Sequence, residues 1–291
     1  KNREAAYKNV INAASNLSLN TKIHTFFRNM SFANKTRVIV LVAILGVAAV
    51  GSAVIVTQLL PGDSSGESIK LTVLTNAGIM IEADGLRIYI DPYDIPSTYS
   101  SLPADAVLIT HPHGDHYNST IIEMLQKEGT INIMPSNMSA EIALHDAVGV
   151  VPGDTVMVGD ISVTAFYMYT TAPEGYDASH PPEANWTSYI IDINGFTIFH
   201  AGDSKNLTEY TQLAGTIDVA LLPLGPGCQS MAGIEVVDAT DKLQPQYFIP
   251  IHTTDLSAEL FIVAYEDEIL EVVPDCTPFW LEHFTFYTFD L

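Results

Sequence analysis

Three histidines and one aspartate lie within six residues of one another in the segment 110–118, THPHGDHYN. They follow the apolar run 106–109, which has the composition of a buried strand. Imidazole and carboxylate groups are ligands of Zn²⁺, Mn²⁺ and Fe. Four such donors on one loop would repel or compete with each other unless a cation bound them together. The segment therefore predicts a metal site at the end of a strand, in preference to a solvated polar loop.

Two more candidate ligands follow strand-like runs later in the chain. The segment 197–204, TIFHAGDS, ends a strand with a Gly-Asp pair that contains Asp203, and the segment 247–252, YFIPIH, ends another strand with His252. Side chains alternate between the two faces of a strand, which places His200 on the opposite face from Asp203. We therefore interpret His200 as structural.

The spacing His-x-His-x-Asp-His after a strand resembles the signature of the metallo-β-lactamase fold hydrolases. The Gly-Asp and Pro-x-His segments resemble later motifs of the same family, and so do Ile90-Asp91-Pro92 and the segment 218–225. The similarity covers about residues 70–255. It is closest to the branch that includes L-ascorbate-6-phosphate lactonase and, more distantly, N-acyl-phosphatidylethanolamine phospholipase D.

The resemblance implies two divalent cations, with Zn²⁺ favoured over Mn²⁺ or Fe, and hydrolysis by a hydroxide that bridges them. The first cation would be bound by His111, His113 and His180. The second would be bound by Asp115, His116 and His252, and the Asp203 carboxylate would bridge the two. Asp115 and Asp203 are the candidate catalytic residues. Either Asp115 or a metal-bound water would protonate the leaving group.

His180 is the ligand that depends most on the resemblance. With His200 set aside, His145 and His180 are the histidines between the first motif and Asp203. His145 falls in a helical run, which favours a surface or half-buried position. His180 begins the segment 180–189, HPPEANWTSY, which is similar to the His-Pro…Trp-x-x-Tyr segment of the lactonase-like branch. We therefore expect His180 to complete the site.

Two positions depart from the family pattern on the substrate side of the site. Asn76 stands where relatives often have a histidine, and Thr253 stands where an aromatic residue is common. Neither change removes a metal ligand. Four aromatic residues are candidates for lining the pocket, although a core position is favoured for each: Tyr117, Tyr169, Trp186 and Tyr189.

Strands and helices alternate along the part of the chain that must position these residues. Strands are expected at 71–74, 79–82, 86–91, 107–110, 131–134, 155–158, 161–167, 187–193, 196–201, 219–223 and 247–251. Helices are expected near 120–127, 140–147, 207–214, 236–243 and 256–270. Such interleaving in two halves predicts two sheets between helical layers. This is the αββα sandwich of the α/β class that the resemblance implies.

A run of 23 uncharged, mostly apolar residues at 38–60 precedes this domain. At 1.5 Å rise per residue, the run is long enough to cross a hydrocarbon core of about 30 Å. It predicts one transmembrane helix, in preference to a buried soluble helix or a cleaved signal peptide. The domains that follow from this prediction are a basic cytoplasmic segment at 1–37, the transmembrane helix, a linker at 61–68 and the αββα domain at 69–291.

Charge is divided very unevenly between the two ends of the chain. Residues 1–62 carry seven Lys and Arg against one acidic residue, a net charge of +6, whereas residues 63–291 carry five against 33, a net charge of −28. Basic residues on one side of a span favour a cytoplasmic N-terminus and an extracytoplasmic domain. The negative domain would repel phosphate backbones, which disfavours nucleic acid as a partner or substrate.

The favoured function is therefore a membrane-anchored, extracytoplasmic hydrolase of an ester, lactone or phosphodiester in a small or lipid-like molecule. The alternative is a non-catalytic accessory subunit of a membrane assembly, and a homo-oligomer or membrane complex is compatible with either. Cys228 and Cys276 lack the Cys-x-x-Cys spacing of a thiolate metal site, and the sequence is compatible with a single disulfide between them. The domain contains four Asn-x-Ser/Thr sequons for N-glycosylation, at Asn118, Asn137, Asn185 and Asn206.

Overall fold

The computed structural model describes residues 68–172, 174–225 and 230–291, which belong to one compact unit. Its first sheet has the strand order β14-β1-β2-β3-β4-β5-β6. These strands are β1 (Ser68–Val73), β2 (Ile79–Ala83), β3 (Leu86–Ile90), β4 (Ala106–Leu108), β5 (Ile131–Pro135), β6 (Val148–Val150) and β14 (Phe286–Asp290). Strands β3 to β6 run parallel, and β14, β1, β2 and β3 pair antiparallel.

The second sheet has the order β13-β12-β11-β10-β9-β8-β7. Its strands are β7 (Thr155–Val158), β8 (Ile161–Tyr167), β9 (Thr187–Ile193), β10 (Phe196–His200), β11 (Val219–Pro223), β12 (Tyr247–Ile251) and β13 (Thr277–Pro278). Strands β10 to β13 run parallel, and β7 to β10 pair antiparallel. Each sheet therefore has a parallel group whose strands all end at one edge.

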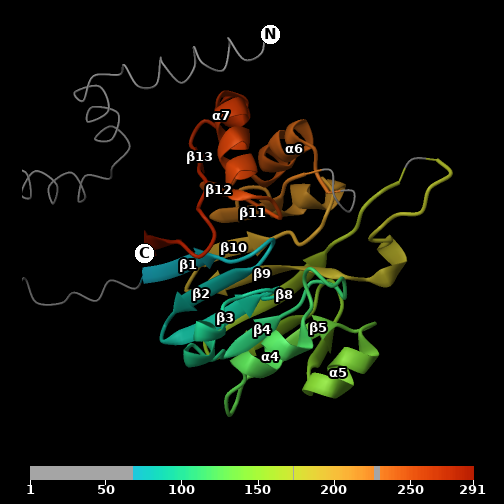
Figure 1. Ribbon diagram of the computed structural model, residues 1–291. Coiled ribbons are helices and arrows are strands. Elements are labelled where there is room, and N and C mark those ends of the chain that lie inside the picture. The colour runs from blue at the N-terminus through green and yellow to red at the C-terminus, as the bar shows by residue number, and fades with distance from the viewer. Residues whose placement is uncertain (1–67, 173, 226–229) are drawn as a thin grey trace, which may run out of the picture. The chain divides into compact units, whose positions relative to one another are not determined.

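Helices cover the outer face of each sheet. The α-helices are α4 (Ser119–Leu125), α5 (Ser139–His145), α6 (Gly233–Leu243) and α7 (Asp255–Val272), and the 3₁₀-helices are η1 (Ser97–Ser101), η2 (Pro182–Ala184) and η3 (Thr208–Leu213). Figure 1 shows α4 and α5 beside the first sheet and α6 and α7 beside the second. The arrangement is the predicted αββα sandwich.

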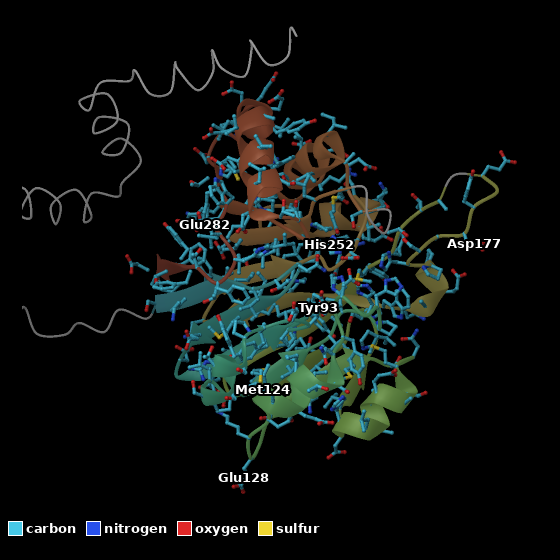
Figure 2. All side chains as sticks on the ribbon, viewed as in Figure 1. Tyr93, Met124, Glu128, Asp177, His252 and Glu282 are labelled. Atoms are coloured by element: carbon cyan, nitrogen blue, oxygen red, sulfur yellow. The ribbon has the colours of Figure 1, made fainter. Side chains whose placement is uncertain are left out.

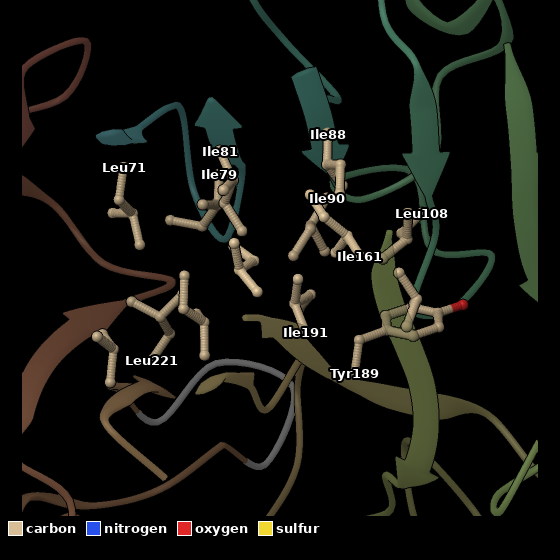
Figure 3. Close-up of a cluster of buried hydrophobic side chains, with 14 of the residues drawn as sticks. Leu71, Ile79, Ile81, Ile88, Ile90, Leu108, Ile161, Tyr189, Ile191 and Leu221 are labelled. Carbon is tan, nitrogen blue, oxygen red and sulfur yellow. The ribbon is translucent and has the colours of Figure 1, made fainter. Parts of the chain in front are cut away.

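The central core lies between the two sheets. Figure 3 shows Ile88, Ile90 and Leu108 of the first sheet facing Ile191 and Leu221 of the second. Neighbouring residues on the same strands point the other way, toward the helices, as side-chain alternation requires. This alternation divides the buried side chains into one inner layer and two outer layers, each outer layer packed under a helical pair.

Most of the predicted elements are present with small differences at their ends. The segment expected as a helix at 207–214 is the 3₁₀-helix η3. Three strands were not predicted, namely β6, β13 and β14. Cys276 is buried and free, and burial raises the pKa of its thiol to about 12.

The predicted cytoplasmic segment (1–37), transmembrane helix (38–60) and residues 61–67 of the linker lie outside the described residues, as does Cys228. Within the residues that are described, no helix combines the length and the apolar composition needed to span a membrane.

Candidate metal centre

The candidate ligands lie on loops that meet at one edge of the sandwich. The segment 111–116 follows β4, Asp203 follows β10 and His252 follows β12, so each comes after the carboxyl end of a strand in a parallel group. His180 precedes β9, which pairs antiparallel with β10 and therefore begins where β10 ends. Residues up to 141 positions apart along the chain thus reach one site through strand direction alone.

His111, His113 and His180 form a three-imidazole group at one side of the site. One nitrogen from each lies within 4.8 Å of those of the other two. The Nε2 atoms of His111 and His180 are 3.3 Å apart. Both of these residues are fully buried, whereas His113 is partly exposed. Three neutral imidazoles at such separations match the protein ligands of a catalytic Zn²⁺ site.

Asp203 lies between this group and a second one. Its Oδ2 is 3.9 Å from His111 Nε2 and 3.6 Å from His180 Nε2. On the other side, Oδ1 is 3.1 Å from His116 Nε2, and Oδ2 is 3.2 Å from His252 Nε2. A carboxylate with two imidazoles on each side has the position of a bridging ligand.

Asp115 completes the second group with His116 and His252. Its Oδ2 is 3.5 Å from His252 Nε2 and 3.9 Å from His116 Nε2. The Asp115 side chain is 41% exposed, in contrast to the buried Asp203. The second group therefore contains a carboxylate that both solvent and substrate can reach.

The chemistry of this donor set fits divalent cations. The buried atoms His116 Nε2, His252 Nε2 and both carboxylate oxygens of Asp203 have no partner with hydrogen-bond geometry, although each imidazole nitrogen lies only 3.1–3.2 Å from one of the two oxygens. Buried polar atoms are nearly always paired, because leaving one unpaired costs about 1–3 kcal/mol. Donor atoms that crowd together without bonding to each other are directed at a shared centre, as metal ligands are.

Asp91 holds His116 in a ligating orientation. This buried carboxylate accepts hydrogen bonds from the Thr110 amide at 2.8 Å, from the Thr110 hydroxyl at 2.6 Å and from His116 Nδ1 at 2.8 Å. Because Nδ1 of His116 donates its proton to Asp91, the neutral form of the imidazole has its lone pair on Nε2, the atom that faces Asp203. In the sequence, the only signal of this role is that Asp91 is an acidic residue at the end of an expected strand, in the motif Ile90-Asp91-Pro92.

Thr110 sets the tautomer of His111 in the same way. The Thr110 hydroxyl has one proton, which it donates to Asp91, so it accepts from His111 Nδ1 at 2.9 Å. His111 is therefore protonated on Nδ1 and presents an unprotonated Nε2 to His180 and Asp203. In His180 the Nδ1 atom faces the Ser179 hydroxyl at 3.0 Å, which leaves Nε2 for the site.

Burial sets the protonation of the first group. It lowers the pKa of His180 to about 4. Burial and the charge of His116 lower the pKa of His111 well below its ordinary value. Both imidazoles are neutral at pH 7, which is the form that binds a metal.

Carboxylates set the protonation of the second group. At His116 the effect of burial is outweighed by Asp91 and Asp203, which raise the pKa of His116 well above its ordinary value. At His252 burial is likewise outweighed by Asp115 and Asp203, which raise its pKa to about 9. Burial opposes ionisation of Asp203, but the two imidazoles hold its pKa well below the usual range. Without a bound cation these imidazoles carry protons that a cation would displace.

Asn76 connects the turn between β1 and β2 to both loops of the second group. Its side-chain amide donates to the Asp115 backbone oxygen at 3.1 Å and to Asp115 Oδ2 at 3.3 Å, and its backbone oxygen accepts from the His252 amide at 3.0 Å. Asn76 and His252 both have positive φ, 61° and 56°. An amide here positions a ligand but cannot transfer a proton.

Of the aromatic residues considered for the pocket, one lies against the metal-site imidazoles and another lies in the central core. Trp186 packs against His111, His113 and His180, with ring centroids 5.2–5.6 Å apart. Tyr189 is buried in the central core and donates to the Ile109 backbone oxygen.

Residues outside the site have partners of their own. Tyr117 bonds to His145 Nε2 at 3.0 Å, so the structure does not bring His145 into the site. His200 bonds through Nε2 to the Ala77 backbone oxygen at 2.7 Å, and Tyr169 bonds to Glu209.

A cavity of about 710 Å³ opens beside the second group. It is lined by Asn76, Asp115 and His252, and also by Thr254 and His283. Figure 2 labels His252 and Tyr93, both of which line this cavity. The volume is within the range typical of small-molecule sites.

Known proteins share this architecture and sequence pattern. The family described as Beta-lactamase superfamily domain matches residues 70–252. A UPF0173 metal-dependent hydrolase of Thermococcus kodakarensis is 28% identical over 196 residues, covering 63% of this chain and 84% of that protein. One from Pyrococcus furiosus is 29% identical over 199 residues, with the same coverage.

Solved structures agree with these sequence relatives. A Parabacteroides distasonis protein described as a metal-dependent hydrolase has 26% identity and a TM-score of 0.65, covering 75% of this chain and 95% of that one. Igni18, a metallo hydrolase of Ignicoccus hospitalis, shares the fold with 21% identity and a TM-score of 0.63, covering 77% and 99%. The chain therefore belongs to the β-lactamase superfamily, as a metal-dependent hydrolase with the metallo-β-lactamase fold.

Proposed function

We propose that the seven clustered donors bind two divalent cations, with Zn²⁺ favoured, and that the protein hydrolyses an ester, lactone or phosphodiester. The observation that carries this proposal is the buried Asp203, whose unpaired oxygens have two imidazoles on either side. Two bound cations would lower the pKa of a water between them and stabilise the charge that develops on the scissile group. A non-catalytic subunit would have no use for such a donor set.

Positioning of the cations, proton transfer and exclusion of water are assigned to different residues of the site. The buried imidazoles and Asp203 fix the positions of the cations, and Asp91 and Thr110 fix the imidazoles. Asp115 is the exposed carboxylate of the site, and Asn76 holds it in orientation. It is placed to accept a proton from the attacking water and to pass it to the leaving group. Trp186 shields the three-imidazole side from water.

We assign the chain to the lactonase-like branch of the family. This proposal is supported by His180 and Trp186, two residues of the branch-like segment, which lie together at the site with ring centroids 5.6 Å apart. Tyr189, the third residue of the segment, supports it less directly, because its hydroxyl fixes the backbone at Ile109, two residues before the first ligand.

We also propose that residues 38–60 anchor the protein in a membrane with the catalytic domain outside the cytoplasm. The support is the uncharged run and the change in net charge from +6 to −28 across it. Protease added to intact cells should digest the domain. Protection of the domain together with cleavage of the N-terminal segment would reverse the topology.

A comparison of His180→Ala with His145→Ala tests the proposed site. Both residues are histidines between the first motif and Asp203, but only His180 lies among the donors. His180→Ala should lower bound metal by about one equivalent per chain and reduce ester or lactone turnover by at least about 100-fold. His145→Ala should change neither. Equal metal content in the two variants would refute the role of His180.

A further inference from the structure

We infer that the substrate is an uncharged ester or lactone carrying an apolar chain, with the scissile group beside Asp115 and His252 and the chain in a second cavity formed largely by α6 and α7. This inference rests on the hydrolytic function proposed above and narrows its substrate class. Three features of the described residues carry it: the join between two cavities, the exposed apolar side chains beside the second cavity, and the pairing of every cationic side chain.

The second cavity has a volume of about 990 Å³ and adjoins the cavity beside the metal centre. Leu224, Gly225 and Ser257 line both. A substrate could therefore extend from one into the other without leaving the protein. The apolar residues that line the second cavity include Met231, Leu260, Phe261, Ala264 and Tyr265.

Exposed apolar side chains lie beside the second cavity. Leu260 lines it and is 57% exposed, and Leu256 and Val263, at the spacing of the same face of α7, are 63% and 75% exposed. Ile234, in α6 next to the lining residue Gly233, is 63% exposed. Clustered exposed apolar side chains mark binding surfaces. Because this surface adjoins a cavity that shares lining residues with the one beside the metal centre, an apolar substrate chain accounts for it better than a second copy of the protein would.

All five Lys and Arg side chains of the described residues are paired with carboxylates. The pairs are Lys70 and Arg87 with Glu82, Lys127 with Asp105, Lys205 with Glu235, and Lys242 with Asp238. Anionic groups of substrates are usually bound by arginine or lysine. A phosphate or carboxylate on the part of the substrate that lies away from the metals would have to displace an existing partner while entering a domain with a net charge of −28.

Lys205 is the cation that lines the second cavity, and its pairing is well supported. Its Nζ donates to Glu235 at 2.8 Å and to the Ser230 backbone oxygen at 3.1 Å. Glu235 also accepts from the Ala232 amide at 2.7 Å, which caps α6. Displacing Glu235 would therefore leave the helix uncapped as well as break the ion pair. The cavity favours a neutral apolar occupant.

A series of p-nitrophenyl esters tests this substrate class on the metal-loaded full chain. Between acetate and decanoate, kcat/KM should rise by about three-fold to four-fold for each added methylene until the cavity is filled. A carboxylate at the far end of the chain should lower kcat/KM by at least about ten-fold relative to the neutral ester of equal length. A flat series, or a preference for the carboxylate ester, would overturn the inference and leave hydrolysis of acetate intact.

Ala264→Trp and Ala143→Trp are a matched pair of variants. Both residues are exposed alanines on helices, α7 and α5, but only Ala264 lines the cavity. Ala264→Trp should abolish the gain from long chains, so that the decanoate ester is turned over no faster than the acetate. Ala143→Trp should leave the whole series unchanged. The same result for both variants would show that the chain does not enter the cavity.

Binding of Nile red, an uncharged apolar dye, separates this inference from the proposed function. The full chain should bind the dye, Ala264→Trp should reduce its affinity at least about ten-fold, and Ala143→Trp should not. Dye binding without turnover of any ester or lactone would refute hydrolysis but retain the cavity's ligand class. No difference between the variants in dye binding, or conversion of a dimer to a monomer by Ala264→Trp, would refute the inference itself.

Discussion

At the scale of single residues, the candidate ligands depend on neighbours that fix where each imidazole carries its proton. Asp91 and Thr110 form a hydrogen-bonded pair that sets Nε2 as the free nitrogen of both His116 and His111. Two of the most deeply buried donors thus share one support. Loss of that support should reach the metal centre without removing a ligand.

Asp91→Asn should therefore weaken metal binding by about 10-fold to 100-fold. The amide would present a donor where His116 and Thr110 both need an acceptor. Asp218→Asn is the matched control, because Asp218 also accepts from a threonine, through the Thr197 amide and hydroxyl at 2.7 and 3.0 Å. Titration with a competing chelator measures both affinities. An unchanged affinity in Asp91→Asn would contradict the account.

Metal binding should release protons at pH 7. The raised pKa of His252, about 9, means that this imidazole is protonated below pH 9 when no cation is bound. A ligand must be neutral, so binding displaces the proton, and affinity should rise as pH increases toward 9. Calorimetry in two buffers of different ionisation enthalpy would measure the release, which should be smaller in His252→Ala. Equal heats in the two buffers would contradict the prediction.

The seven donors predicted from the sequence lie together among the described residues, but the residues that support them were not predicted. The four residues of the first motif are local, and Asp203 and His252 follow recognisable strand ends. The roles of Asp91 and Asn76 arise from contacts 25 and 39 residues away along the chain. Such contacts have no local pattern, because they depend on which strand ends the fold brings together.

At the scale of elements, the site depends on sharp turns at the ends of strands. Asp91, which follows β3, and His252, which follows β12, have φ values of 47° and 56°. Gly202 follows β10 at φ +57°. A side chain at Gly202 would meet Met168 Sδ at 2.6 Å and Thr110 Cβ at 3.1 Å. The turn that presents Asp203 therefore requires glycine at position 202 for two reasons, its positive φ angle and its close packing.

Gly202→Ala should lower the free energy of unfolding by about 2–4 kcal/mol, because backbone strain and overpacking both oppose it. Gly195→Ala is the control: Gly195 has φ +90° and nothing within 4 Å of an added Cβ, so strain alone should cost about 1 kcal/mol. Chemical denaturation measures both. Equal losses in the two variants would show that packing against Met168 and Thr110 does not constrain the turn.

Long or alternating elements could be predicted from sequence, and short edge strands could not. The strand β14 has one buried residue, Phe289, and gains its hydrogen bonds from β1, more than 200 positions earlier. The strands β6 and β13 have three and two residues. The strands β6 and β13 are too short to show alternation, and β14 buries only one side chain, so the pairing of all three depends on the completed sheet.

At the scale of the whole molecule, the N-terminal segment and the domain have net charges of opposite sign. A net charge of −28 over residues 63–291 places many carboxylates near one another, and the five cations in this range already have partners. Self-repulsion of this kind destabilises a compact state. It also favours the cation-binding role proposed for the site.

The thermal midpoint of the protein should rise with NaCl between about 0.01 and 0.3 M. Over this range the screening length falls from about 30 Å to less than 8 Å, so repulsion between distant carboxylates is relieved. Differential scanning calorimetry at constant pH would follow the midpoint. A midpoint that falls or stays constant would mean that repulsion does not limit stability.

The central claim is that the seven donors bind two divalent cations, and counting bound metal tests it most directly. Elemental analysis of protein loaded with Zn²⁺ and then dialysed should give about two equivalents per chain. Asp203→Asn, which removes charge from the residue between the two groups, should lose at least one equivalent. Wild-type protein that retains no metal, or two equivalents retained in Asp203→Asn, would contradict the account.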